Sequence, residues 1–358
     1  MKHMAIIPIF IPHRGCPNDC VFCNQRAITA RQEPVLPSDV RRRVEEYLPT
    51  LAGRGLSCVE IAFFGGSFTG LPIEEQRAYL AVAREYKESG RIQRIRLSTR
   101  PDYIDDTILT NLKEYGVDTI ELGVQSFDER VLRLSNRGHS AAAVYESAGR
   151  IRDHGFELGI QLMIGLPGDT VETAVRSAEE AVRLRPAAAR LYPTVILKDT
   201  ALYRDYQAGR FIPFTQEQML SAAKEMYKTL SAAGVKIIRV GLKSTDLICD
   251  GGEGAAVSGT YHPAFRQLVC GQIAREELEE QLRALLRTER RARVLFQSSG
   301  TSFSYMIGQS GANRRYFQEH YPGLEFRFGR NDRLPEETYA VSWDEAVRRG
   351  LGNGKHRK

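Results

Sequence analysis

Two patterns of apolar and polar positions alternate along the first two thirds of the chain. Short apolar runs rich in β-branched and aromatic residues each lead into a glycine or polar turn, and then into a segment with apolar residues at helical spacing. Strands that alternate with helices favour parallel pairing through right-handed crossovers. The predicted strands span residues 5–11, 59–64, 92–98, 119–124, 157–164 and 190–196, and the predicted helices span 38–51, 74–88, 105–115, 141–154 and 171–185.

This alternation predicts an α/β fold and is compatible with two architectures. Six strand and helix units can form a partial (β/α)6 barrel, and the same periodicity allows a doubly wound sheet. In both architectures the functional residues lie just beyond the carboxyl ends of the strands. The last helix of the series is predicted to open with Asp169 and Glu172 at capping-box spacing and to end before Pro186.

The last third of the chain predicts a small α+β extension. The glycine-rich stretch at 250–259 indicates a loop or a domain joint, so we divide the chain into a barrel domain at 1–245 and an extension at 246–358. Apolar spacing predicts a long helix from Pro263 to about Arg287. The elements predicted after it are a strand at 293–298, a short helix at 303–307, a glycine turn at 308–311, a helix at 312–320 and a strand at 324–328.

The composition fits a cytoplasmic protein with an anionic partner. With 358 residues, 42% of them hydrophobic, the chain is long enough for one large barrel with additions or for two domains. Its net charge of +6 favours a nucleic acid or a phosphorylated substrate. No stretch approaches the ~18 apolar residues that cross a bilayer, and the start of the chain does not resemble a signal peptide. The scattered positions of Cys58, Cys249 and Cys270 argue against a disulfide framework.

Three cysteines, Cys16, Cys20 and Cys23, follow the first predicted strand within one short loop. Thiolates are soft ligands that suit zinc or an iron–sulfur cluster. Three thiolates leave a fourth ligand position open, which indicates chemistry at the metal, because structural sites usually have four protein ligands. A structural zinc site is the alternative, and it would need His13 to bend back as the fourth ligand.

The cysteine loop resembles the radical S-adenosylmethionine (radical SAM) superfamily in its x3 and x2 spacing and in the aromatic Phe22 before the last cysteine. Further motifs narrow the resemblance to the radical SAM domain of the Elongator catalytic subunit, and they spread over most of residues 13–210. The motifs are GGSFTGLP at 65–72, STRPDY at 98–103, ELGVQSFDERVL at 121–132, NRGH at 136–139, LMIGLPG at 162–168 and YPTVILKDTALY at 192–203.

By this resemblance the fold is a partial (β/α)6 radical SAM barrel, and Cys16, Cys20 and Cys23 hold three irons of a [4Fe–4S] cluster. The fourth iron binds the amino and carboxylate groups of S-adenosylmethionine. Electron transfer from a reductant such as flavodoxin or ferredoxin then yields methionine and a 5′-deoxyadenosyl radical. The cofactors supply that chemistry, while the protein positions them and excludes water.

The resemblance also implies contacts to S-adenosylmethionine at the strand ends. The glycine-rich motif receives the methionine amino group, because a glycine pair lets backbone approach a ligand closely. Polar side chains after the third and fourth strands contact the ribose or the methionine carboxylate, and a turn after the fifth strand lies near adenine. The cofactor-binding residues implied in this way are Phe22, Gly65, Gly66, Ser67, Ser98, Arg100, Gln125, Ile164 and Gly165.

Several of these side chains have plainer alternative roles. Arg100 precedes a proline at a strand end, where it can bind a carboxylate bidentately, but a solvated surface arginine is the alternative. Gln125 is either a ligand contact or a strand-end cap. In the NRGH motif, Arg137 is either structural or a phosphate contact, and His139 fits a loop hydrogen-bonding role better than catalysis.

The extension contains a second candidate site. Its order of strand, helix, GxxG turn, helix and strand resembles the core of a KH domain, whose GxxG loop binds four backbone nucleotides. We place this KH-like segment at about 291–329. The alternative is a small α+β cap that covers the barrel. The candidate nucleic-acid contacts are Gly308, Gly311, Arg314 and Arg315.

The chain departs from the Elongator pattern after the barrel. Only about 110 residues follow it, fewer than an acetyltransferase domain with its connecting region requires. We therefore expect a radical SAM enzyme without an acetyltransferase domain that acts on RNA, with tRNA as the expected partner. One alternative is a radical SAM enzyme with a small-molecule substrate, as in oxygen-independent coproporphyrinogen oxidase. Another is an RNA-binding protein with a structural iron–sulfur cluster.

Overall fold

The structure is a computed structural model that describes residues 4–11, 15–16, 20–24, 35–242, 256–257, 259, 261–288 and 291–344. The chain divides into two compact units, Met1–Pro263 and Ala264–Lys358, and each is described by itself. The boundary predicted between residues 245 and 246 lies outside the described residues.

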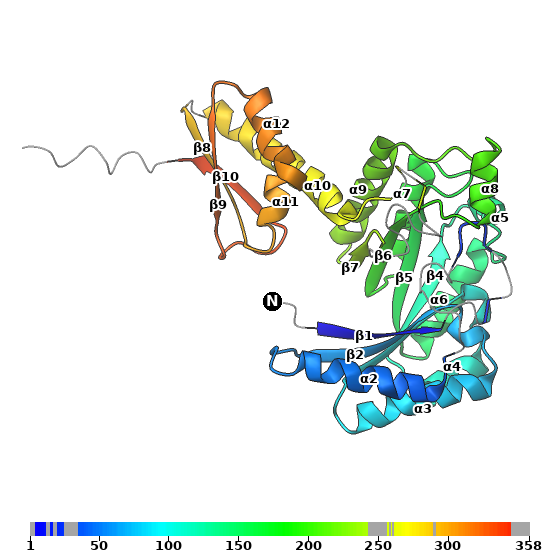
Figure 1. The fold of residues 1–358 in the computed structure, drawn as a ribbon. Helices are drawn as coiled ribbons and strands as arrows, with labels where there is room; N and C mark the ends of the chain where they lie inside the picture. Colours follow the sequence, from blue (N-terminus) through cyan, green and yellow to red (C-terminus); the bar gives the residue numbers. More distant parts are fainter. Residues whose placement is uncertain are drawn as a thin grey trace, which may run out of the picture. The chain divides into compact units, whose positions relative to one another are not determined.

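The first unit is built on one sheet of seven parallel strands that pair in sequential order (Figure 1). A doubly wound sheet reverses its strand order at a switch point, whereas this order runs without reversal, so the sheet curls into a half-barrel. The predicted α/β barrel fold is therefore confirmed. The strands are β1 (Met4–Ile11), β2 (Cys58–Gly65), β3 (Arg94–Thr99), β4 (Thr119–Gln125), β5 (Glu157–Ile164), β6 (Ala188–Pro193) and β7 (Lys236–Val240).

Two strand predictions need correction. The sequence pattern gave six strands and missed β7, because its five residues, KIIRV, include two charged positions and are too few to show alternation. Strand β6 begins at Ala188 and ends at Pro193, two to three residues earlier than predicted. Its register with β7 shifts between Ala189 and Arg190.

Helices connect the strands of the first unit, and several begin at side chains that cap the first turn. One of them, the helix predicted to open with Asp169 and Glu172, begins differently from the prediction. Thr170 is its N-cap and forms a capping box with Thr173, whereas the Asp169 carboxylate accepts a hydrogen bond from the Gly165 amide at 2.8 Å. The helices are α2 (Pro37–Leu51), α3 (Ile73–Glu88), α4 (Asp106–Glu114), α5 (Glu129–Leu134), α6 (Ala141–Asp153), α7 (Val171–Arg183), α8 (Ala201–Gln207) and α9 (Gln216–Ala232), with short 3-10 turns at η1 (Phe68–Gly70) and η2 (Pro101–Tyr103).

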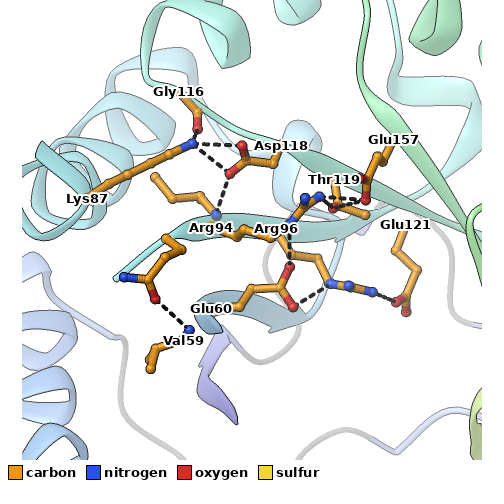
Figure 2. A network of polar contacts seen from close by, with 12 residues as sticks. Val59, Glu60, Lys87, Arg94, Arg96, Gly116, Asp118, Thr119, Glu121 and Glu157 are labelled. Atoms are coloured by element: carbon orange, nitrogen blue, oxygen red, sulfur yellow. Dashed lines mark hydrogen bonds and ion pairs between the residues drawn. The ribbon is translucent and has the colours of Figure 1, made fainter. Parts of the chain in front are cut away.

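The two faces of the sheet differ in polarity because side chains alternate along each strand. The outer face is apolar, with Ile61, Phe63 and Leu97 almost fully buried. Charged residues fill the inner face (Figure 2). Arg96 joins Glu60 at 3.0 Å and Glu121 at 3.2 Å. Buried charges are tolerated only when they are paired in this way.

The second unit confirms the predicted element order and adds a strand. A long helix, α10 (Phe265–Thr288), precedes β8 (Arg293–Ser298), α11 (Phe303–Ile307), the turn η3 (Gln309–Gly311), α12 (Ala312–His320), β9 (Glu325–Arg330) and β10 (Tyr339–Trp343). The strand order is β10-β8-β9, with β8 parallel to β9 and antiparallel to β10. Phe296 and Phe317 lie at the centre of its core.

Candidate active site

The cysteine loop lies beyond the carboxyl end of β1 and is held by the helices α5 and α8, which follow β4 and β6. The Val21 amide donates to the Ser135 carbonyl at 3.2 Å, and the Leu202 amide donates to the Val21 carbonyl at 2.8 Å. Phe22 packs with the apolar cluster formed by Ile196, Leu202 and Phe211, so it anchors the loop. Sequence positions 12–14 and 17–19, which include the proposed zinc ligand at position 13, lie outside the described residues.

The three thiols differ in exposure: Cys16 is exposed, Cys20 is buried and Cys23 is half-buried. The Cys23 amide donates to the Cys20 carbonyl at 2.9 Å, which closes the loop between these two residues. Within the described ranges, no group of three or more His, Cys, Asp or Glu side chains is arranged to hold a metal ion. The loop therefore brings Cys16 within electrostatic range of Cys20 and ties Cys23 to Cys20 through the backbone, without forming a complete ligand set among the described residues.

The glycine-rich turn after β2 packs directly on the cysteine loop. A Cβ atom at Gly15 would lie 2.0 Å from the Ser67 carbonyl oxygen, and a Cβ at Gly70 would lie 2.1 Å from the Gly15 carbonyl oxygen. Gly65 has φ +112°, and its Cβ would lie 2.6 Å from the Ile11 carbonyl oxygen. Glycine at these positions is required by the close approach of backbone to backbone.

Backbone from the same turn reaches the Cys16 sulfur. Desolvation by the surrounding protein raises the pKa of the Cys16 thiol, although this residue keeps solvent access. A hydrogen bond from the Ser67 backbone and the positive charges of Arg100 and Arg137 oppose that rise in pKa, and the nearby Cys20 adds to it. The hydrogen bond and the two cations favour a thiolate, but desolvation outweighs them, so the pKa of the Cys16 thiol stays above its usual value.

Arg100 is fixed by contacts with the turn after β2 and with its own turn. Its amide donates to the Ser67 hydroxyl at 3.2 Å. Its Nε and Nη2 atoms donate to the Asp102 carboxylate at 2.9 and 2.8 Å. The bidentate face expected to bind a ligand carboxylate is therefore occupied by Asp102. The remaining nitrogen, Nη1, is buried and makes no hydrogen bond within the described part of the chain.

Arg137 is the functional candidate that the sequence pattern left undecided. Its Nη1 atom donates to the Cys20 sulfur at 3.2 Å, and its Nη2 atom donates to the Gly123 carbonyl at 2.5 Å. Gln125 lies nearby at the end of β4 with φ +68°, a conformation that side chains rarely adopt. Its buried Oε1 atom has no hydrogen-bond partner among the described residues. Backbone strain of this kind is typical of functional sites.

The other predicted cofactor contacts line neighbouring strand ends. The Ser98 hydroxyl lies 3.4 Å from Glu121 and 3.3 Å from the Gln161 amide nitrogen. Ile164 is fully buried, and Gly165 follows it with φ +78°. The turns after β2, β3, β4 and β5 therefore present all of these residues at one edge of the sheet.

The second candidate site belongs to the second unit. Its glycine turn has positive φ at Gly308, Ser310 and Gly311. The buried Asn313 side chain donates to the Gly271 carbonyl at 2.7 Å and fixes the turn against α10. Arg315 donates to the Ser310 carbonyl at 2.6 Å, and the exposed Arg314 stands beside it in sequence. The KH resemblance of this turn stays a prediction.

The buried His139 makes the stability of the fold depend on pH. Burial, and then the charge of Arg137, lower the pKa of His139 to about 4. A depressed folded-state pKa stabilises the fold above the ordinary value near 6.5, and that stability is lost as the pH falls toward 4. Between pH 7 and pH 4.5 we expect the cluster-free wild type to lose about 2 to 3 kcal/mol more unfolding free energy than His139→Gln. Urea unfolding at both pH values measures this, and equal losses in the two proteins would contradict it.

None of the helices that the structure describes is both long and apolar enough to cross a membrane. The helix outer faces instead carry exposed ion pairs, for example between Arg84 and Glu88 on α3.

Two family models match the chain, the radical SAM superfamily over residues 10–181 and the radical SAM C-terminal domain over residues 186–275. Elongator complex protein 3 of Bos taurus is 31% identical over 266 residues. A Methanocaldococcus infernus protein named tRNA uridine(34) acetyltransferase is 25% identical over 256 residues. Each match covers 61% of this chain and 48% of the relative, so the chain spans about half the length of the curated relatives it matches.

A solved structure shows the same fold. The Methanocaldococcus infernus Elp3 protein with an N-terminal deletion superposes with a TM-score of 0.61 at 20% identity, covering 78% of this chain and 64% of that chain. The two family models, the sequential parallel sheet and the cysteine loop at its carboxyl edge agree with one another. The chain therefore belongs to the radical SAM superfamily, and this membership implies a [4Fe–4S] cluster and S-adenosylmethionine as its cofactors.

Proposed function

We propose that the protein is a radical SAM enzyme that abstracts a hydrogen atom from an RNA substrate, with tRNA as the substrate class. The observation that carries the radical chemistry is the convergence of the cysteine loop with the turns after β2, β3 and β4. We further propose that the protein works in the cytoplasm with a small electron-transfer protein, such as flavodoxin or ferredoxin, as its reductant.

The residues at this edge fit the two cofactors. Arg100 is only 3% exposed, and its Nη1 atom is a buried donor without a partner among the described residues.

 Gln125 adds a buried acceptor, Oε1, at the end of the adjacent strand. An unpaired guanidinium nitrogen suits a carboxylate, and an unpaired amide oxygen suits an amino or hydroxyl group, which are the groups that S-adenosylmethionine presents. The glycine-rich turn keeps backbone close to the same edge.

Each group of residues then has a distinct role. Cys16, Cys20 and Cys23 would hold the cluster, and Arg137 would orient the Cys20 sulfur through its 3.2 Å contact. The polar groups at the strand ends would bind and orient S-adenosylmethionine. When bound, the cluster and S-adenosylmethionine together supply a 5′-deoxyadenosyl radical. The remaining contribution of the protein is to hold the substrate near the 5′ carbon of that radical and to exclude water.

An RNA substrate is supported by three independent features. One relative is named as a tRNA uridine acetyltransferase. The chain carries a net charge of +6. The second unit presents the GQSG turn with Arg314 and Arg315 directly after it, where phosphates would lie in a KH-like complex.

The RNA proposal is tested by reversing charge at the turn. In Arg314→Glu/Arg315→Glu we expect tRNA affinity to fall about 10-fold or more at low salt, and the slope of log K against log salt to decrease by about 2. Filter binding or gel shift across a salt series measures both quantities. The control is Arg287→Glu. A double control that added Arg275→Glu would match the change in charge, but it would also disturb the aromatic contact of Arg275.

That control lies far from the turn on the same unit. Arg287 is exposed and follows Gly271, the residue beneath the turn, by 16 positions along α10 (287 minus 271). At 1.5 Å per residue the two positions are about 24 Å apart along the helix. Unchanged tRNA affinity in the double variant, or an equal loss in Arg287→Glu, would rule against RNA binding at the turn.

A further inference from the structure

Two arginines lie side by side on the inner face of the sheet. Arg190 of β6 and Arg239 of β7 are register partners across the parallel pair, so both side chains leave the sheet on the same face. Like charges at directly opposite positions of neighbouring strands repel and destabilise a sheet. Such a pair is expected only where an anion balances it.

Among the described residues, carboxylates balance the positive charge of these two arginines only in part. Arg190 is 6% exposed, and its Nε atom donates to the Glu121 carboxylate at 2.9 Å. That carboxylate is shared with Arg96, which binds it at 3.2 Å. The Nη2 atom of Arg190 is buried and has no partner within the described part of the chain. Arg239 is half-buried and makes no hydrogen bond or ion pair with any residue that the structure describes.

The surroundings of the two guanidinium groups suit a bound oxyanion. The Tyr192 hydroxyl accepts a hydrogen bond from Arg190 Nη1 at 3.4 Å and can itself donate to a ligand. Desolvation raises the pKa of Tyr192, and the charges of Arg190 and Arg239 both act against that rise, so both guanidinium groups lie near the hydroxyl. The Phe64 ring lies 4.9 Å from the Arg190 guanidinium carbon and covers one side.

We propose that Arg190, Arg239 and the Tyr192 hydroxyl bind an oxyanion group of the substrate, a phosphate or a carboxylate, on the inner face of the barrel. Arg190 precedes the last residue of β6, Pro193, by three positions, so the bound group would lie deeper in the barrel than the strand-end turns. Planar guanidinium groups bind both oxyanions bidentately. This inference rests on the proposed radical SAM function for its substrate, but not on that substrate being RNA.

The test measures direct binding to the full-length, cluster-loaded protein by calorimetry. The probes are uridine 5′-monophosphate, uridine and malonate, which separate phosphate and carboxylate sources from the uncharged nucleoside. In Arg239→Gln we expect the anionic probe to bind about 10- to 100-fold more weakly than in the wild type, because a charge-assisted hydrogen bond is lost. Arg183→Gln, whose side chain on α7 is 71% exposed, should bind like the wild type.

The outcomes separate this inference from the wider proposal. Loss of malonate or nucleotide binding in Arg239→Gln supports the site even if tRNA proves not to be a substrate, and the probe that binds identifies the source of the oxyanion. Arg190→Gln provides a second variant, with the same weakening expected in protein that shows the wild-type circular dichroism spectrum. Equal affinities in the wild type and Arg239→Gln, or a wild type that binds neither anion more tightly than uridine, would overturn the inference.

Discussion

Cys20→Ala is expected to abolish cluster assembly and the cleavage of S-adenosylmethionine. The loop offers three thiolates to the cluster, so each of them is needed. Cys20 is the buried one, and its sulfur also accepts a hydrogen bond from Arg137. Outer-shell changes at metal sites typically cost 10- to 100-fold, so removal of a ligand should lower activity by more than about 100-fold. Iron content per chain and release of 5′-deoxyadenosine after reduction measure the two effects.

A cysteine from the same unit provides the matched control. Cys58 is half-buried at the start of β2, at the opposite end of that strand from the glycine-rich turn. Cys58→Ala should therefore keep its iron and its activity within about 2-fold of the wild type, since it removes only a small side chain. A Cys20→Ala protein that retained wild-type iron and cleavage would contradict the assignment of the loop.

Glu121→Ala is expected to give the largest loss of stability. Glu121 is 1% exposed and accepts contacts from Arg96, Arg190 and Gln161, so it joins its own strand, β4, to three others on the inner face. Its removal leaves buried positive charge without its partner, which typically costs about 3 to 5 kcal/mol. Urea unfolding followed by circular dichroism measures the change in the free energy of unfolding.

The control for this variant is an exposed carboxylate on the outer surface. Glu46 of α2 is 52% exposed and pairs with Arg43 at 3.4 Å. Glu46→Ala should change the free energy of unfolding by less than about 1 kcal/mol, as exposed ion pairs usually do. Similar losses in Glu46→Ala and Glu121→Ala would show that the inner-face network contributes little to stability.

The sequence was sufficient for the features that depend on local pattern. The cysteine spacing, most strand positions and the glycine-rich turn after β2 all follow from neighbouring residues, and the structure places them at one edge of the sheet. In the second unit, α11 and α12 were predicted at their observed bounds because they flank a glycine turn, whereas α10 begins two residues later than predicted.

The features that depend on distant contacts were missed. Arg137 reaches Cys20 across 117 sequence positions, so the NRGH motif alone could not show which group it binds. The pairing of Arg190 with Arg239 requires the register of β7, a strand too short to be recognised from its pattern. The capture of Arg100 by Asp102 is local, but its geometry depends on the 3-10 turn that follows β3.

The most direct test of the radical SAM assignment is anaerobic reconstitution of the full chain with iron and sulfide, followed by reduction in the presence of S-adenosylmethionine. We expect about one cluster per chain, held by three cysteines, and the release of 5′-deoxyadenosine and methionine in equal amounts. A fully loaded and reduced protein that releases neither product would contradict the radical SAM chemistry proposed for this site.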